Sequence, residues 1–428
     1  MIKVLFIIAG DFSFDEMVYL DSFINQLPGT TIESRILSPQ LPLTHVNIKN
    51  RNVEVTPAKP GFGPDEWQEL IQDFEPQIVI LCDPYILLGP EAPDLSYIDL
   101  AWLDELRSVV GVIDFKANLL KTADDQLALK EYVLSQTTPP YTLDYDYLIK
   151  VCPPHDAIPT QNPKVLQWGC QDPMAALSSY TIRDEVRTQL SCRPETRIVT
   201  MVFPMENSFQ ALEKGLFAHF PLVVETLIHY LNQLEEEYLL AIINMPPPFN
   251  DFDFDNVQVR FFPTLDMHLL SDLLKTTELF ITESLTYPGH ILSALRDIPG
   301  ISLGSSLGLD AQGNYTHHFE ELSPFLQLKL DVQRQESPES LFPYISFPSH
   351  FQREWLQTEM FQERYLYFLA DLFDEAKTTA LIDDLLSQGP RRQAFQTALV
   401  DYRQRKLELT QDAESIVRHL VTAPPRNL

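Results

Sequence analysis

Residues 279–304 read LFITESLTYPGHILSALRDIPGISLG, and they give the clearest indication of the fold class. It opens with Leu279 to Thr282, a short apolar run that is typical of a strand covered on both faces. Pro288 to Leu295 has helical spacing, and proline suits a first helical turn because its missing N–H would have no partner there. Gly300 to Leu303 is a further apolar run. The stretch therefore predicts strand, helix and parallel strand, the repeating unit of an α/β sheet.

The same alternation surrounds this stretch in the second half of the chain. Further strands are predicted at 197–203, 238–245 and 257–262, and further helices at 217–234 and 266–276. Three helical segments are predicted to finish the chain, at 351–373, 377–387 and 391–420. The aromatic side chains of the first of these three, such as Tyr367 and Phe368, are expected to pack in the core.

An independent series of elements fills the first half. Strands are predicted at 3–9, 77–81 and 110–115, and helices at 15–27, 67–74 and 100–109. Residues 139–173 hold seven prolines and predict irregular structure. The fold class expected is α/β, with two Rossmann-like doubly wound parallel-sheet domains facing across a cleft. We expect domains at 1–190 and 191–390 and a C-terminal helix at 391–428 that packs back across them.

Charge and cysteine content narrow the classes of partner. The 428 residues carry 31 Lys and Arg against 60 Asp and Glu, a net charge of -29. The electrostatic field of this negative charge repels phosphate backbones and anionic lipids. We therefore expect neither nucleic acid nor a membrane surface as a partner, and a neutral or basic acceptor is favoured. The four cysteines follow no zinc or disulfide pattern, and no targeting or membrane-spanning segment is visible. We expect a cytoplasmic protein with reduced thiols.

Three segments in order carry a family resemblance: 261–267 (FFPTLDM), 279–284 (LFITES) and 298–304 (IPGISLG). Together they resemble the nucleotide-binding domain of GT-B glycosyltransferases. In that superfamily one strand ends in a loop at the nucleotide base, and the next ends in a loop of small residues at the diphosphate. The stretch 342–348 (FPYISFP) is also similar to an uncharacterised bacterial family of glycosyltransferase-like proteins.

The resemblance implies a nucleotide-sugar donor, with no other cofactor and no metal ion. Amide groups at the start of the helix from Pro288 would face the diphosphate, because helix N-termini favour anions. The donor-binding residues expected are Asn207, Ser208, Pro263, Leu265, Ser284, Thr286, Gly289 and His290. Glu283 argues against this site, because an acid there would repel phosphate. The alternatives are that 284–290 is a simple capping loop and that Asp266 is only a helix cap.

The acceptor side is expected after the first strand, at 10–16 (GDFSFDE), where GT-B enzymes often place a general base. Asp11 is the predicted catalytic base, since a base must reach the acceptor proton. Acceptor contacts are expected from Gly10, Phe12, Asp15 and Glu16, the last two also being reserve bases. The alternative is that Asp15 caps a helix and Glu16 favours its first turn. Asp83 and Asp114 also end apolar strands. One interpretation is that they line the same cleft, but they are predicted to be ordinary turn carboxylates.

Other chemistries find little support. Residues 250–256 (NDFDFDN) lack the sixth-position Gly and twelfth-position Glu of a calcium loop, so an acidic surface turn is predicted, as it is for 144–146 (DYD). Zinc-hydrolase, serine-hydrolase and P-loop motifs are absent from the sequence.

Three functions remain open. The first is a glycosyltransferase that moves a sugar from a nucleotide-activated donor to an unidentified peptide or small-molecule acceptor. The alternative is a catalytically degenerate GT-B-like binding or accessory protein for a basic partner protein, which the small number of glycines, 14 in all, also fits. The third is a sugar-nucleotide epimerase of the same architecture.

Overall fold

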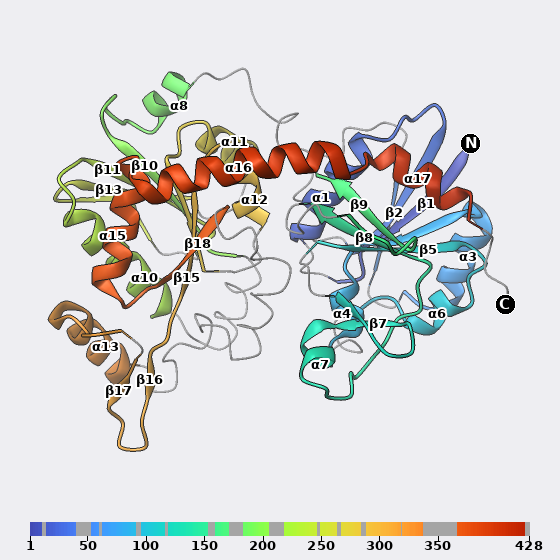
Figure 1. The fold of residues 1–428 in the computed structure, drawn as a ribbon, viewed down its shortest axis with the longest axis horizontal. Coiled ribbons are helices and arrows are strands. Elements are labelled where there is room, and N and C mark those ends of the chain that lie inside the picture. Colours follow the sequence, from blue (N-terminus) through green and yellow to red (C-terminus); the bar gives the residue numbers. More distant parts are fainter. Residues whose placement is uncertain are drawn as a thin grey trace. The chain divides into compact units, whose positions relative to one another are not determined.

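The computed structural model describes fourteen ranges of the chain. These are residues 1–10, 14–39, 53–59, 62–90, 96–115, 119–152, 159–170, 183–204, 218–245, 249–262, 267–283, 288–317, 319–336 and 366–423. They form two compact units (Figure 1). Unit 1 comprises the described parts of Met1–Pro173 and Tyr402–Leu428, and unit 2 those of Met174–Ser349 and Glu363–Asp401. Each unit is built on a seven-stranded sheet, so the predicted pair of parallel-sheet α/β domains is confirmed.

The unit 1 sheet has the strand order β3-β2-β1-β4-β5-β8-β9, with every neighbouring pair parallel. Its strands are β1 (Ile2–Ile7), β2 (Ile32–Pro39), β3 (Val53–Ala58), β4 (Ile78–Leu81), β5 (Val109–Asp114), β8 (Tyr147–Cys152) and β9 (Val165–Gly169). The chain runs outward from β1 to β3 and then returns to the other side of β1 at β4. The β1/β4 boundary is therefore a topological switch point, where open α/β sheets bind ligands.

Helices cover both faces of this sheet, whose central strands β1, β4 and β5 are apolar along most of their length. Side chains of α3 (Pro64–Phe74), α4 (Pro84–Leu88) and α6 (Leu100–Asp104) share a core with Leu5 and Ile7. On the other face, α1 (Phe14–Asn25) places Phe23 edge-on to Phe6, with ring centroids 5.9 Å apart. The last helix, α17 (Ala413–Val421), contacts β4, β5 and β9 of the same sheet. A small hairpin, β6 (Leu119–Lys121) and β7 (Leu127–Leu129), precedes α7 (Lys130–Leu134).

The unit 2 sheet repeats this plan with the order β12-β13-β11-β10-β14-β15-β18. Its strands are β10 (Arg197–Val202), β11 (Tyr238–Ile243), β12 (Phe252–Phe254), β13 (Val257–Phe262), β14 (Leu279–Thr282), β15 (Gly300–Gly304) and β18 (Tyr367–Asp371). All neighbours are parallel except the edge strand β12. The switch point of this sheet lies between β10 and β14.

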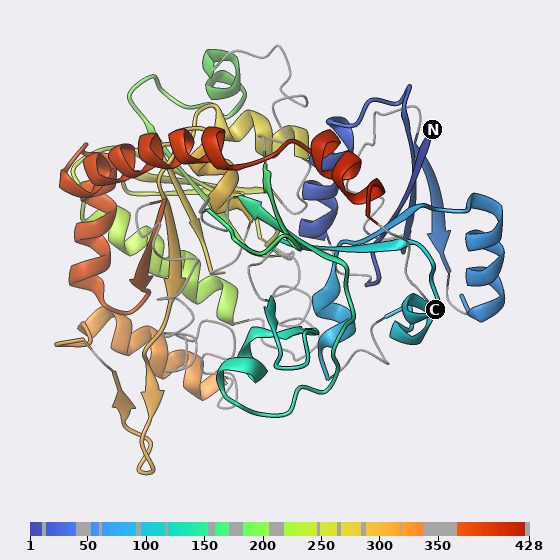
Figure 2. The same cartoon turned by 45° about the vertical axis from the view of Figure 1, so that its right-hand side comes forward.

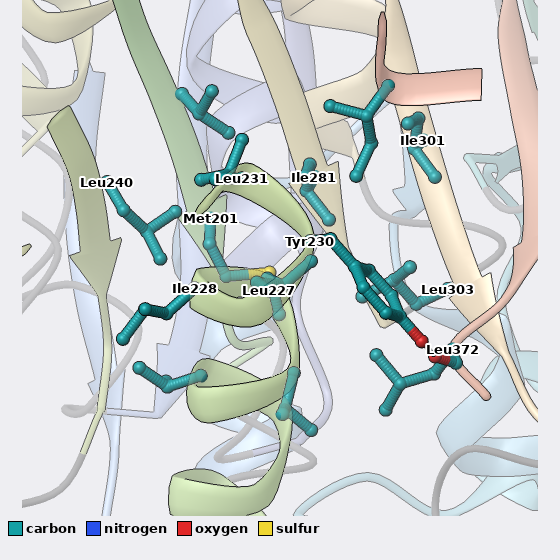
Figure 3. Packing of buried hydrophobic residues seen from close by; sticks show 14 of the residues in the cluster. Met201, Leu227, Ile228, Tyr230, Leu231, Leu240, Ile281, Ile301, Leu303 and Leu372 are labelled. Atoms are coloured by element: carbon teal, nitrogen blue, oxygen red, sulfur yellow. Dashed lines mark hydrogen bonds between the residues drawn. The ribbon is translucent and has the colours of Figure 1, made fainter. Parts of the chain in front are cut away.

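One face of the unit 2 sheet holds a large core. Here α10 (His219–Asn232), α13 (Pro324–Glu336) and α15 (Glu375–Leu386) share a cluster of buried side chains with alternate residues of the strands. Figure 3 shows Tyr230 of α10 lying across Leu303 toward Leu372, and its hydroxyl donates a hydrogen bond to the Leu372 carbonyl. This bond ties α10 to the end of β18.

The opposite face carries α12 (Pro288–Leu295), which contacts β14 and β15. The described part of the unit also contains α8 (Arg183–Gln189) and α11 (Met267–Leu274), which contact each other, and α16 (Pro390–Leu409), which begins in unit 2. A hairpin of β16 (Gly308–Leu309) and β17 (Tyr315–Thr316) projects away from the unit 2 sheet in Figures 1 and 2. No helix in the described ranges has both the length and the apolar character needed to cross a bilayer.

Several predicted elements differ from the observed ones. The proline-rich stretch 139–173 contains the strands β8 and β9, which are short runs between prolines and were hidden by the loop composition of their surroundings. The predicted helix 100–109 ends at Asp104, because β5 already begins at Val109. The predicted turn at 250–256 contains β12, whose Phe252 and Phe254 are exposed as expected of a surface segment.

The C-terminal prediction also needs two corrections. Residues 367–371, placed in a helix by the sequence, form β18, the parallel partner of β15. Helix 391–420 is two helices, since Asp412 caps α17 by accepting a hydrogen bond from the Ser415 amide at 2.7 Å.

Candidate functional site

The candidate site in unit 2 lies at the switch point of its sheet. The last residues of β10 and β14, Val202 and Thr282, are paired neighbours in the sheet. Glu283 follows β14, and His219 is the first residue of α10, the next described helix after β10. Nε2 of His219 lies 2.7 Å from Oε1 of Glu283, and the two side chains are only 3% and 1% exposed. A buried imidazole and carboxylate therefore join the start of α10 to the residue that follows β14.

This contact changes the effect that Glu283 is expected to have on a bound phosphate. The sequence argues that an acid at this position would repel a bound phosphate, and that argument assumes an isolated carboxylate. In the structure the carboxylate is buried against His219, which supplies either a hydrogen bond or a compensating positive charge. Sequence reasoning missed His219, because it lies 64 residues away. The signal that could have found it is positional, since the segments following strands one and four of a Rossmann-like unit meet at the switch point.

The start of α12 is where the sequence places the donor diphosphate. Gly289 and His290 lie in its first turn, at the end of the helix whose dipole favours anions. The His290 imidazole stacks on the Tyr367 ring, with ring centroids 4.5 Å apart, and makes a T-shaped contact with the Phe280 ring. A Cβ added at Gly300 would come within 2.5 Å of this imidazole, so glycine makes room for it. The His290 ring is thus a core group, and the donor role that stays predicted for this residue belongs to its backbone.

A second carboxylate lies at the carboxyl end of β18. Asp371 accepts hydrogen bonds from the amide and hydroxyl of Ser306, at 2.9 and 2.5 Å, and from the Phe373 amide at 3.0 Å. Burial nevertheless raises the pKa of the Asp371 carboxyl above its ordinary value, because desolvation outweighs these bonds. Asp371 therefore ties the segment after β15 to the end of β18.

In unit 1 the switch point holds Asp83, which follows β4. Its carboxylate is fully buried and accepts hydrogen bonds from the Ala9 amide, 2.8 Å from each oxygen, and from the Gly10 amide at 2.9 Å. Gly10 lies close to Ile86, since an added Cβ would sit 2.9 Å from its Cγ1. Asp83 was predicted to be an ordinary turn carboxylate, and the structure makes it the anchor of the segment that leaves β1.

Two further acids lie near this edge. Glu16 in α1 is buried, with 2% of its surface exposed. Asp114 ends β5 and accepts a hydrogen bond of 2.6 Å from the Tyr85 hydroxyl and one of 3.3 Å from the Leu119 amide.

Burial and the nearby Asp83 carboxylate raise the pKa of the Cys82 thiol well above its ordinary value, so this cysteine stays a neutral thiol.

Several predicted site residues fall outside the described residues. These are Asp11, Phe12, Asn207, Ser208, Pro263, Leu265, Ser284 and Thr286. The backbone of Asp15 belongs to α1, but its side chain is not described. Among predicted site residues, the structure thus places Gly10 and Glu16 in unit 1 and Gly289 and His290 in unit 2.

The acidic segments weighed as metal sites have other partners. Asp251 accepts a hydrogen bond from the Phe261 amide at 2.8 Å, and Asp253 forms an ion pair of 2.8 Å with Arg260. Asp146 accepts a hydrogen bond from the Val110 amide at 2.8 Å. Within the ranges that the structure describes, no three Cys, His, Asp or Glu side chains gather as metal ligands.

Known structures share this fold. The spinosyn forosaminyltransferase SpnP aligns with 99% of this chain and 100% of its own at 12% identity and a TM-score of 0.53. The glycosyltransferase VinC in complex with dTDP aligns with 98% and 100% of the two chains at 11% identity and a TM-score of 0.51. A Listeria monocytogenes protein assigned as a UDP-N-acetylglucosamine 2-epimerase aligns with 100% and 99% at 13% identity and a TM-score of 0.54. These likenesses show that the chain has a GT-B fold.

At the level of sequence the relationships are narrower. No curated protein matches the chain. One family model covers almost all of it, from residue 23 to residue 423, and is described as a family of unknown function, DUF6365. The chain therefore belongs to the DUF6365 family and has the GT-B fold.

Proposed function

We propose that this chain is a glycosyltransferase that moves a sugar from a nucleotide-activated donor to an acceptor. The observation that carries the proposal is the unit 2 switch point, where the Glu283 carboxylate is buried against His219 and α12 is the next described helix along the chain. This removes the main objection to an anion at that edge. The fold supports the same class, because SpnP and VinC are glycosyltransferases and VinC was solved with dTDP.

On the donor side, main-chain amides at Gly289 and His290 and the positive end of α12 stabilise the departing diphosphate. The hydroxyls of Ser284 and Thr286 add donors, Pro263 and Leu265 offer backbone to the base, and Asn207 and Ser208 face donor or acceptor. Because these groups supply the charge stabilisation, transfer proceeds without a metal ion.

On the acceptor side, Asp11 takes the proton from an acceptor hydroxyl or amide. The freed lone pair attacks the anomeric carbon as the bond from that carbon to the diphosphate oxygen breaks. Asp83 supports this step, because its carboxylate fixes the Gly10 amide directly before the base. The acidic protein surface favours a neutral or basic acceptor. The four cysteines are free and three of them are buried, in keeping with a cytoplasmic protein.

Titration calorimetry with UDP, dTDP and their sugar conjugates tests the proposal. Binding of at least one diphosphate and transfer of its sugar to an acceptor are expected, with no loss of activity in EDTA. Asp11→Asn is expected to abolish transfer and to leave donor binding intact. If no nucleotide binds, a glycosyltransferase is refuted and the accessory protein for a basic partner takes its place. If a bound nucleotide sugar is converted to its epimer without an acceptor, the epimerase is the correct function.

A further inference from the structure

Helix α10 carries two histidine–glutamate pairs of very different character. At its first residue, His219 contacts Glu283 with both side chains almost completely buried. Ten residues later, Nε2 of His229 lies 3.1 Å from Oε1 of Glu375, with the side chains 26% and 22% exposed. That Glu375 oxygen also accepts a hydrogen bond from Gln233 at 2.6 Å, and the His229 ring stacks on Phe325 at 3.9 Å. The second pair is thus held by neighbouring side chains as well and is partly exposed to solvent.

The position of the first pair is tied to the switch point. Glu283 is the residue after Thr282, the last residue of β14, and Thr282 pairs with the last residue of β10. At 1.5 Å per residue, His229 lies about 15 Å further along α10 than His219. Only the His219–Glu283 pair therefore stands where the sheet is expected to meet an anionic ligand.

Burial makes the charge of Glu283 consequential. A carboxylate removed from water acts on nearby charges through a low effective dielectric, so its field reaches a ligand with little screening. A nucleotide diphosphate at this edge brings more negative charge to the same region. An uncompensated Glu283 would therefore lower its affinity.

We propose that His219 is a positioning residue of the donor site, which holds and compensates the Glu283 carboxylate so that a nucleotide diphosphate can bind at the β10/β14 edge. This inference rests on the proposed function. It assigns a role to a residue pair outside the predicted donor contacts, and it explains how an acid is tolerated directly after β14.

Calorimetric titration of UDP and dTDP into four variants tests the role. His219→Gln keeps a side-chain N–H but cannot carry charge, and it is expected to bind the diphosphates about tenfold more weakly than wild type. Glu283→Gln is expected to bind them more tightly than wild type. The double variant should regain the affinity lost by His219→Gln, because the charge that required compensation is gone. His229→Gln is the matched control and should bind within about twofold of wild type.

The titration is repeated with UMP to separate charge from packing. A charge effect weakens UDP binding more than UMP binding, whereas a packing defect at α10 weakens both equally. Equal loss for UDP and UMP, equal affinity of His219→Gln and His229→Gln, or no recovery in the double variant would each overturn the proposal while the glycosyltransferase function stands. If wild type binds neither UDP nor dTDP, both proposals fall. If His219→Gln does not fold, Glu283→Gln decides alone, because unchanged or weaker binding in that variant overturns the role.

Discussion

Replacing Asp83 with Asn tests whether a buried carboxylate anchors the segment after β1. The carboxylate is fully buried and accepts hydrogen bonds from the amides of Ala9 and Gly10. A hydrogen bond to a charged group contributes about 1.5–3 kcal/mol, and a buried donor left without a partner costs about 1–3 kcal/mol. An asparagine oxygen can still accept from one amide, but its NH₂ group cannot accept from the other. We therefore expect Asp83→Asn to lower the unfolding free energy of unit 1 by about 2–4 kcal/mol.

The assay is urea unfolding, followed by a probe that reports on unit 1 alone, because two-domain chains do not unfold in one step. The tryptophans of the first half serve as this probe, since Trp67 and Trp168 are buried in unit 1. Asp99→Asn is the matched control. Asp99 accepts one backbone bond, from the Ala101 amide at 2.9 Å, but it does so as an exposed helix cap, where Asn is almost as good. If both variants shift stability equally, burial of the Asp83 carboxylate does not have the energetic role argued here.

Two further predictions concern the end of β18. Tyr230→Phe should lower the unfolding free energy of unit 2 by about 1–2 kcal/mol, because the Leu372 carbonyl loses its buried donor; no change in the urea midpoint would refute this. The pKa of Asp371 is raised in the folded state, so folding favours its protonated carboxyl. The stability that this protonated form contributes is present at about pH 4 and below, and it is lost as pH rises through the raised pKa. Asp371→Asn should therefore flatten the stability profile above pH 4, and a variant profile parallel to wild type would contradict the assignment.

Helices and strands were predicted most accurately where the hydrophobic periodicity agrees with the residues that begin or end an element. The ranges of β13, β14 and α12 are observed as predicted, since each apolar run is closed by a turn residue or opened by a proline. β18 was missed because its apolar residues, taken alone, do not distinguish a strand from a buried helix. Its place in the sheet is set by pairing with β15, a contact between residues far apart in the chain.

The same limit applies to the candidate sites. The chain segments at the switch points could be predicted, because the order of strands determines which loops meet. The partners within them could not. Asp83 is satisfied by amides 73 and 74 residues away, and Glu283 by an imidazole in α10, 64 residues away. Charge compensation of this kind depends on tertiary contacts that local patterns do not contain.

The return of α17 to the unit 1 sheet has a consequence for synthesis on the ribosome. Ile416, Val417 and Leu420 are fully buried, and Leu420 reaches within 3.6 Å of the position of a Cβ on Gly111 in β5. While the nascent chain is being made, this patch of the first sheet stays bare until the whole of unit 2 has been translated. A premature stop codon before Ala413 would leave that patch permanently exposed, which makes early-terminated products of this gene natural clients of chaperones and proteases.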